Sequence, residues 1–303
     1  CRISHLRLPN RNLTGSLSLS LGNLSHLEEL VLYENKLSSS IPSTLWNLTG
    51  LTRLDLEDNR LTGELPLGLN QLKLIERFYL SHNFLTGTLP DELTSLTNMN
   101  KIYLTNNLFE GTIPQGFEAL VKLNTLFMNQ NQFTGSIPSG VSLLSKLRYL
   151  SFSRTDISGH IPNEMSKLSS LAFLYLWGTS ISGPLPPELG HLNLLQYFYC
   201  YSTFLTGTLP DTFSQLTSMR VMSFRSNYIT GTLPPSWGVL SDLEFLFLYH
   251  NLLTGTIPNE WGGLTGLQEV HLHVNMLSGS IPSELENLVS LEFMYLYRNY
   301  MSG

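Results

Sequence analysis

The chain has 303 residues, of which 42% are hydrophobic and only 13% are charged. Its formal net charge is −6 and it has no run of Lys or Arg, which argues against nucleic acid or an anionic membrane surface as a partner. No stretch of 18 or more apolar residues occurs, so we expect no direct membrane insertion by this segment.

A repeat of 24 residues organises the whole chain. Asn recurs at this interval from Asn35 to Asn131 and from Asn227 to Asn299, and Thr155, Thr179 and Thr203 take its place in between. The register holds without an insertion through about thirteen repeats, the last of them incomplete. A fixed period of this size is typical of a solenoid, in which each repeat packs only against its neighbours.

Each position of the repeat has a mechanical role, which the stretch that begins at Leu243 illustrates. From Glu244 to Tyr249 the side chains alternate with a period of two, as in a strand. Leu246 and Leu248 are predicted to point inward, and the residues between them outward. Asn251 follows, and its side chain can bond the backbone of the turn, so stacked Asn residues satisfy buried polar groups.

Later positions of the repeat predict a turn and a short helix on the outer side. Gly255 permits backbone angles closed to other residues, and Pro258 fixes the turn that follows it. Residues 259–264 are long enough for one turn of 3₁₀ helix. Stacking such repeats places all strands in one parallel sheet, and the bulkier helical side makes the stack curve around that sheet.

The skeleton LxxLxxLxLxxNxLTGxIP resembles the plant-type leucine-rich repeat over essentially the whole chain. The resemblance implies an α/β repeat solenoid: a right-handed superhelix with a parallel sheet on the concave face, short 3₁₀ turns on the convex side and an extra short strand. It also implies a secreted or cell-surface glycoprotein that recognises a ligand. The opening from Cys1 to Gly15 resembles the end of a cysteine-bearing cap, so residues 1–303 are predicted to be a single repeat domain truncated at both ends.

The outward columns of the early repeats are charged and mixed in sign. Examples are Arg7, Glu29, Arg53, Asp55 and Glu57. We interpret this section as a solvated surface on which opposite charges on adjacent strands form weak pairs. A polar docking site is the alternative interpretation.

The outward columns of the later repeats are aromatic. Eleven of the 13 Tyr residues of the chain fall in the outward columns of all repeats together, seven of them from Tyr175 onward, a distribution that chance does not explain. Tyr and Trp offer a large contact area with a polar tip, so we predict a ligand-binding face. It comprises Tyr175, Trp177, Tyr197, Tyr199, Tyr201, Arg225, Phe245, Phe247, Tyr249, His271, His273, Phe293, Tyr295 and Tyr297.

Two interpretations of this aromatic section remain open. Rings on neighbouring strands can stack and stiffen the sheet, each pair contributing roughly 0.2–1 kcal/mol. A large exposed apolar surface can also recognise a peptide, a protein or a glycan. One feature of plant peptide receptors is missing, because Arg225 and Arg298 stand alone rather than as an Arg-x-Arg pair, which argues against recognition of a free peptide carboxylate.

No constellation of residues predicts catalysis, a cofactor or a resident metal. There is no phosphate-binding Gly loop, no Gly-x-Ser-x-Gly and no His-Glu-x-x-His. His250, His271 and His273 could meet, but polar groups at the rim of the aromatic section explain them better than a metal site does. We therefore predict a protein that is not an enzyme.

Other residues carry smaller predictions. The sequons at Asn12, Asn23 and Asn47 avoid the aromatic section and can carry glycans if the chain is secreted. Cys200 occupies a core column and is predicted to be a buried thiol. Trp46 lies one step outside the core column of Trp237 and Trp261, so we predict that it is exposed.

The favoured function is thus a receptor-like, non-catalytic extracellular recognition module. The alternative is a structural component of a matrix, cell wall or surface filament that self-associates through the same aromatic face. A weaker alternative is an inhibitor of a wall-degrading enzyme, since plant inhibitors share this type of repeat.

Overall fold

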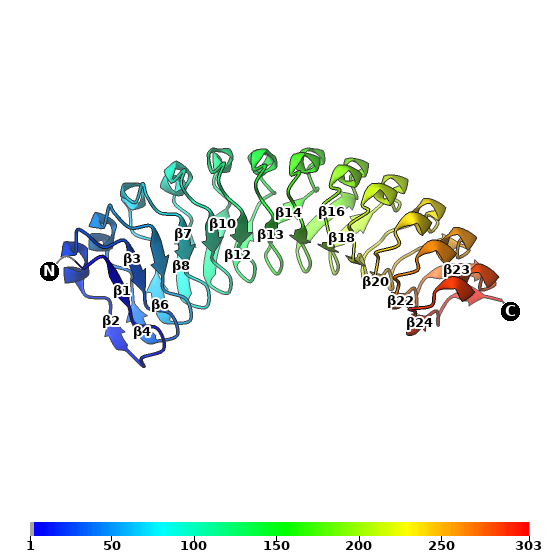
Figure 1. Ribbon diagram of the computed structural model, residues 1–303, viewed down its shortest axis with the longest axis horizontal. Helices are drawn as coiled ribbons and strands as arrows, with labels where there is room; N and C mark the ends of the chain where they lie inside the picture. The colour runs from blue at the N-terminus through cyan, green and yellow to red at the C-terminus, as the bar shows by residue number, and fades with distance from the viewer. Residues whose placement is uncertain (1–2, 303) are drawn as a thin grey trace. The chain divides into compact units, whose positions relative to one another are not determined.

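Most repeats pass through a short strand, a turn, a second short strand and a 3₁₀ turn, whereas the repeat that begins with Val221–Ser223 has only isolated bridges at Thr230 and Thr232 in place of the second strand. The structure is a computed structural model that describes residues 3–302. The chain divides into two compact parts, which we call the first half, ending at Asp156, and the second half, beginning at Ile157. Within each half the strands of the long sheet lie on one side and the 3₁₀ turns on the opposite side (Figure 1).

The long sheet is parallel, and neighbouring strands are offset by one repeat. His5 pairs with Glu29 in the first half, and Phe245 pairs with Glu269 in the second. This register confirms the predicted repeat without an insertion. The first half contributes β1 (His5–Arg7), β3 (Glu29–Val31), β5 (Arg53–Asp55), β7 (Arg77–Tyr79), β9 (Lys101–Tyr103), β11 (Thr125–Phe127) and β13 (Tyr149–Ser151). The second half contributes β15 (Phe173–Tyr175), β17 (Tyr197–Tyr199), β19 (Val221–Ser223), β20 (Phe245–Phe247), β22 (Glu269–His271) and β24 (Phe293–Tyr295).

Further parallel strands follow the Asn position and form the expected second set. Their pairs are offset by fewer residues than one repeat, as in Leu108 with Thr86, so these strands are staggered relative to the long sheet. In the first half they are β2 (Thr14–Ser16), β4 (Lys36–Ser39), β6 (Arg60–Gly63), β8 (Phe84–Thr88), β10 (Leu108–Thr112) and β12 (Gln132–Thr134). In the second half they are β14 (Ser158–Gly159), β16 (Ser180–Pro184), β18 (Phe204–Thr206), β21 (Thr254–Gly255), β23 (Met276–Gly279) and β25 (Tyr300–Met301).

One 3₁₀ turn closes each of the first twelve repeats; it follows the Pro of the repeat except in the first, where Ser18 is the N-cap. In the turn predicted for residues 259–264, Pro258 is the N-cap and the Leu264 N–H donates to the Trp261 carbonyl over 3.0 Å. The turns of the first half are η1 (Leu19–Asn23), η2 (Ser43–Asn47), η3 (Leu69–Gln71), η4 (Asp91–Ser95), η5 (Phe117–Ala119) and η6 (Ser139–Leu143). Those of the second half are η7 (Asn163–Lys167), η8 (Pro187–His191), η9 (Asp211–Gln215), η10 (Pro235–Val239), η11 (Asn259–Gly263) and η12 (Ser283–Asn287). Within residues 3–302, no helix is long and apolar enough to cross a lipid bilayer.

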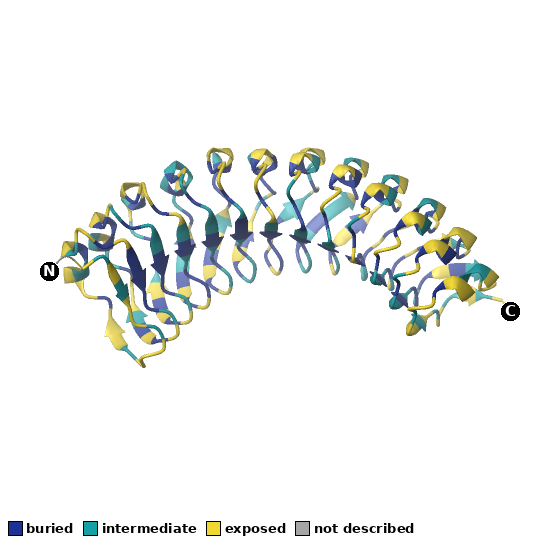
Figure 2. Cartoon of the chain, in the orientation of Figure 1, coloured by how far each residue is buried: buried dark blue, intermediate teal, exposed yellow. Residues whose placement is uncertain are grey.

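The core of each half lies between the long sheet and the turns (Figure 2). The inward residues Leu246 and Leu248 are fully buried, as the alternation predicts. Cys200 is also fully buried, and burial raises the pKa of its thiol to about 12, so the thiol stays protonated and packs as a small apolar group. Cys1 lies outside the described residues.

Buried Asn side chains join successive repeats. The Asn83 amide donates to the carbonyls of Leu56, 2.9 Å away, and Leu80, 3.1 Å away, while its Oδ1 accepts the Leu61 N–H at 2.9 Å. Thr203 has only one proton to donate, and its hydroxyl gives it to Asn227 Oδ1 over 2.6 Å. The Asn repeats therefore satisfy more backbone groups than the Thr repeats do.

The prediction for Trp46 is wrong, because its ring is fully buried. The indole N–H donates to the carbonyl of Pro66 in the next repeat over 2.9 Å. That repeat has the shorter turn η3, preceded by Gly68 at φ 90°, and a Cβ at this glycine would lie 3.9 Å from the indole. The shortened turn thus leaves room for a large ring in a column that elsewhere holds Gly or polar side chains.

Candidate ligand-binding face

All of the predicted ligand-binding residues lie in the second half, on the outward side of the long sheet. We call these side chains the aromatic face. They form three columns that cross β15, β17, β19, β20, β22 and β24, and the third column lies two residues beyond the end of each strand. Because equivalent residues on paired strands are one repeat apart, each column brings its members side by side.

The third column begins as a stack of planar groups that includes Arg225. The rings of Trp177 and Tyr201 are nearly parallel, at 5° and 5.2 Å between centroids. The Arg225 guanidinium carbon lies 3.8 Å from the Tyr201 centroid and 5.4 Å from that of Tyr249, so two phenol rings flank the cation. Its side-chain N–H groups make no hydrogen bond within residues 3–302 and are available to a ligand.

The same column continues through His273. Its ring is stacked on Tyr249 and on Tyr297, with centroids 4.4 Å away in both cases. Burial lowers the pKa of His273, and the positive charges that His271, His250 and Arg298 can carry lower it further. The imidazole is therefore held neutral near pH 7, as an aromatic member of the stack.

The middle column consists of two aromatic groups separated by Ser223. Tyr175 and Tyr199 lie 5.3 Å apart on one side of it. On the other side His271 packs edge-on against Phe247 at 4.8 Å and against Tyr295 at 4.5 Å. Ser223 is almost fully buried, and its hydroxyl has no hydrogen-bond partner within the described part of the chain.

Burial also lowers the pKa of His271, although Glu269 opposes that shift. The His271 Nε2 lies 3.3 Å from a carboxylate oxygen of Glu269. Burial raises the pKa of Tyr199, with its phenol neighbours adding to the effect, so this residue keeps its O–H donor at neutral pH. The face thus presents neutral rings with polar tips.

The first column is the least regular. Phe173 and Tyr197 are stacked at 4.8 Å and 7°, but Val221 on β19 is small and buried. Phe245 and Phe293 lie beyond it, separated by Glu269. Val221 and Ser223 carry no ring, so the first and middle columns are interrupted at β19. Only the third column continues there, through Arg225.

The three His residues do not form a metal site in the described structure. Ring centroids of His250 and His271 lie 6.0 Å and 5.8 Å from that of His273. Between Ile3 and Ser302, no group of three or more His, Cys, Asp or Glu is arranged to hold a metal ion.

The outward columns of the first half depart from the expected solvated surface. Glu29 and Asp55 are buried, with 8% and 3% of their surface exposed. Arg7 donates to Glu29 over 2.9 Å, and Arg53 reaches Asp55 at 2.6 Å. Because these acids are buried against neighbouring side chains, the interpretation of this section as a set of solvated charges is wrong for them.

Sequence reasoning missed two surfaces of the second half. One is a row of exposed apolar side chains on its flank, each directly after the Asn position of its repeat, and this shared position is the signal that could have revealed it. The row comprises Phe204, Tyr228, Leu252, Met276 and Tyr300.

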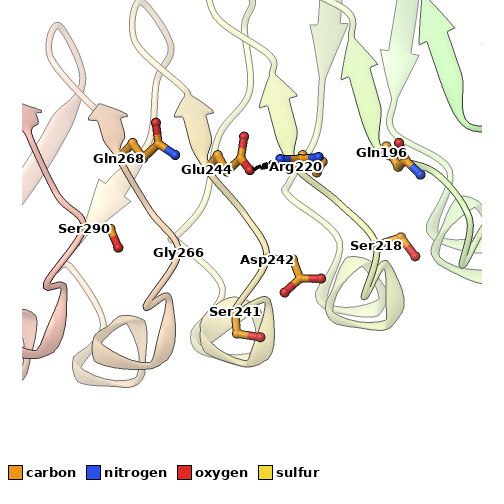
Figure 3. A pocket seen from close by; sticks show the side chains of 9 residues that line it. All are labelled: Gln196, Ser218, Arg220, Ser241, Asp242, Glu244, Gly266, Gln268 and Ser290. Atoms are coloured by element: carbon orange, nitrogen blue, oxygen red, sulfur yellow. Dashed lines mark hydrogen bonds and ion pairs between the residues drawn. The ribbon is translucent and has the colours of Figure 1, made fainter.

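The other surface is a polar groove of about 570 Å³ beside the start of the long strands (Figure 3). Gln196, Arg220, Glu244 and Gln268 line it one repeat apart, and Figure 3 shows their side chains in a single row. Arg220 Nε donates to Glu244 over 3.0 Å, so the charges at the centre of the row neutralise each other.

Family models support the repeat assignment. A model for a leucine-rich repeat region matches residues 126–229, and a single leucine-rich repeat model matches residues 26–48, 50–72, 74–96, 242–264 and 266–288. The chain belongs to the leucine-rich repeat family. None of the curated proteins searched matches it.

Solved structures of plant receptors are similar over nearly the whole chain. The plant peptide hormone receptor RGFR1 in complex with RGF2 is 34% identical with a TM-score of 0.95, covering 96% of this chain and 47% of the receptor. The ectodomain of the receptor kinase GASSHO1/SCHENGEN3 from Arabidopsis thaliana, in complex with CASPARIAN STRIP INTEGRITY FACTOR 2, is 35% identical with a TM-score of 0.86, covering 98% of this chain and 38% of that one. The Arabidopsis receptor kinase HAESA with the peptide hormone IDA and the co-receptor SERK1 is 28% identical with a TM-score of 0.78, covering 100% and 59%. The chain thus spans roughly half the length of these receptors.

Proposed function

We propose that the chain is a receptor-like recognition module that binds a peptide on the aromatic face of its second half. The observation that carries the proposal is the continuous stack from Trp177 to Tyr297, with Arg225 between two phenols. Stacking fixes the rings before a ligand arrives, so little side-chain entropy is lost on binding. Large rings with polar tips are the side chains that dominate binding energy at protein interfaces.

Two features favour a peptide over a glycan or a second copy of the chain. The free N–H groups of Arg225 and the Tyr hydroxyls can bond the carbonyls of an extended backbone, while the rings cover its side chains. The similar structures of RGFR1 and HAESA are complexes with peptide hormones. Nothing in this combination requires catalysis or a cofactor.

The three sequons fit an extracellular location. Asn12, Asn23 and Asn47 are all exposed and lie in the first half, away from the aromatic face. We infer that the chain is displayed outside the cell and glycosylated there. Endoglycosidase treatment of the secreted protein should lower its mass by three glycans, and Asn→Gln changes at these positions should remove them one at a time.

The binding proposal can be tested with a peptide selected on the purified chain from a displayed random library. Changing both Tyr199 and Phe247 to Ala should weaken binding of that peptide about 900-fold, or about 30-fold for each ring, because each ring is expected to contribute a hot-spot energy of about 2 kcal/mol. Tyr228→Ala is the matched control, since this exposed Tyr lies on the flank. Thermal melting should show a nearly unchanged midpoint for all variants.

Two results would count against the proposal. Undiminished binding by the double variant would place the peptide elsewhere, and a large loss of thermal stability with intact binding would assign the rings to sheet stiffening. Sedimentation of the chain alone tests the structural alternative, because assembly that grows with concentration and is lost in the double variant would show that the face packs on another subunit.

A further inference from the structure

Among the described residues that line the polar groove of the second half, none has an apolar side chain. The groove has a volume of about 570 Å³, within the range of roughly 300–1,000 Å³ that holds small ligands in proteins. One side of it is the row of long polar side chains at Gln196, Arg220, Glu244 and Gln268 (Figure 3). A ligand of this groove must therefore bind through polar contacts, in contrast to a ligand of the aromatic face.

A second row, of short residues two positions earlier in each following repeat, keeps the groove open. It lies between the first row and the 3₁₀ turns and consists of Ser218, Asp242, Gly266 and Ser290 (Figure 3). In the last repeats of the first half the same position holds longer side chains, and there Lys122 Nζ donates to Asn98 Oδ1 over 2.7 Å. The second half lacks these bridging side chains, so the space above its short row is free for a ligand.

The amides of the long row are free to bind a ligand. In the first half Asn100 takes the same position, and its Nδ2 donates to the carbonyl of Lys122 over 3.2 Å. Gln196 and Gln268 are half-buried, yet between Ile3 and Ser302 their side-chain amides make no hydrogen bond. Each of them therefore offers one carbonyl oxygen and two N–H donors to a ligand.

The ion pair at the centre of the long row also leaves polar atoms available. Both nitrogens through which Arg220 donates to Glu244 reach the same oxygen, Oε1. Within the described residues, Oε2 of Glu244 accepts no hydrogen bond and Nη1 of Arg220 donates none. Pairing holds both side chains in place before a ligand arrives, which reduces the entropy lost on binding.

The charges of the groove argue against an acidic ligand. Arg220 is neutralised by Glu244, and Asp242 forms no ion pair in the part of the chain that the structure describes. An anion would therefore meet a net negative charge. A neutral ligand with many hydroxyl groups fits better, because a hydroxyl both donates and accepts and can bond an amide, a guanidinium or a carboxylate.

We propose that this groove binds a neutral, extended oligosaccharide along the row from Gln196 to Gln268. Neighbouring strands lie about 4.8 Å apart, so the row spans roughly 14 Å and presents polar groups at a regular interval. A chain of β-1,4-linked hexoses is nearly straight and carries hydroxyl groups along its edge at a similar interval. A peptide fits less well, because its side chains find no apolar lining here. The site is separate from the peptide site proposed on the aromatic face and does not depend on it.

Three tetrasaccharides test the shape and the charge of the ligand. Cellotetraose is a neutral, extended β-1,4-linked chain, and maltotetraose contains the same sugar in a curved, α-1,4-linked chain. Tetragalacturonate carries a carboxylate on every ring. Ligand-observed NMR titration of the intact chain should show that cellotetraose binds at least about tenfold more tightly than the other two, because either mismatch removes two or more hydrogen bonds.

A double variant locates the sugar in the groove. Changing both Gln196 and Gln268 to Ala should weaken binding of cellotetraose about 30-fold, since each lost hydrogen bond is expected to cost about a factor of five. The matched control changes Gln132 and Gln215 to Ala, because both are exposed and lie outside the groove, and it should bind as the wild type does.

The double variant of Tyr199 and Phe247 separates this proposal from the proposed function. It should lose the peptide selected on the purified chain but bind cellotetraose as the wild type does. If it loses cellotetraose instead, the sugar stacks on the aromatic face and the proposal for the groove is overturned.

Four other results would overturn the proposal. The first is no binding of cellotetraose by the wild type, and the second is equal binding by the Gln196 and Gln268 double variant when thermal melting shows that it is folded. The third is binding of maltotetraose or tetragalacturonate at least as tight as that of cellotetraose. The fourth is loss of the selected peptide, but not of cellotetraose, in the Gln196 and Gln268 double variant, which would assign the groove to the peptide.

Discussion

The two halves of the chain share one scaffold but present different outward columns. Asn83 in the first half and Asn251 in the second make the same set of bonds to the carbonyl groups of two repeats. Outward of this common frame, the first half pairs charges around Glu29 and Asp55, whereas the second stacks rings around Arg225 and His273.

This difference shows how a repeat protein separates stability from recognition. Inward columns are constrained by packing and by buried hydrogen bonds, so they are almost the same in every repeat. Outward columns have no such constraint, and they can be charged or aromatic at little cost to the fold. The outward columns of the two halves can therefore bind different ligands while the inward columns beneath them stay unchanged.

If the frame is common, breaking it should have the same large effect in both halves. Asn83→Ala and Asn251→Ala each leave buried carbonyls of two repeats and one buried N–H without partners, so each should lower the free energy of unfolding by about 3 kcal/mol. Urea denaturation of the two variants gives this comparison. The exposed Asn259→Ala should change stability by less than about 0.5 kcal/mol.

Clearly unequal losses from the two Asn variants would show that the halves differ in their frames as well as in their faces. The same result would remove the basis for attributing functional differences to the outward columns alone.

A second prediction separates the faces by their response to pH. Because burial raises the pKa of Glu57 to about 7, the folded state retains a proton that the unfolded chain releases near pH 4.5. The stability from this group is therefore fully present below about pH 4.5 and is lost as the pH rises through 7. After allowance for solvent around the half-exposed carboxyl, the loss should be about 1–2 kcal/mol.

Glu57→Gln should remove this loss and be more stable than the wild type at pH 8. Parallel urea denaturation at pH 4.5 and pH 8 measures the effect, with the exposed Glu34→Gln as the control. If the variant is less stable than the wild type at pH 8, the carboxylate is stabilising in the fold and the sign of the argument is wrong.

The sequence predicts the frame well because its rules are periodic. The 24-residue interval of Asn and the alternation around Leu246 and Leu248 are sufficient to place strands, turns and core. They fail at Trp46, because its burial depends on the short turn η3 in the next repeat, which its own column does not reveal.

The contacts among the outward side chains are less predictable, because they depend on the conformation of each side chain. The repeat interval predicts that Tyr201, Arg225 and Tyr249 are neighbours, but not that the guanidinium carbon lies 3.8 Å from one ring centroid and 5.4 Å from the other. Likewise, the mixed charges of the first half do not reveal that Asp55 is buried or that Glu57 lacks a basic partner. These properties depend on the conformations that long side chains adopt above their smaller neighbours, and a pattern of residue types does not specify those conformations.

The smallest predicted effect is a pH response of the second half, opposite in sign to that of Glu57. Because the pKa of His273 is lowered, the folded state binds fewer protons than the unfolded chain does near pH 6.5. The stability from this neutral imidazole is present above pH 6.5 and is lost as the pH falls through the lowered pKa. His273→Phe keeps a ring between Tyr249 and Tyr297 without a titratable group, so its thermal midpoint should fall less than that of the wild type between pH 7 and pH 5.

His191→Gln, on the exposed turn η8, is the control for this measurement and should follow the wild type across the same range. His271 remains in the His273→Phe variant and has a lowered pKa of its own, so part of the acid sensitivity should persist. If His273→Phe follows the wild type at every pH, the stack tolerates an imidazolium cation as it tolerates the guanidinium of Arg225. The two halves would then differ in the pH dependence of their stability only through Glu57. A positive charge in the third column would not destabilise the aromatic face.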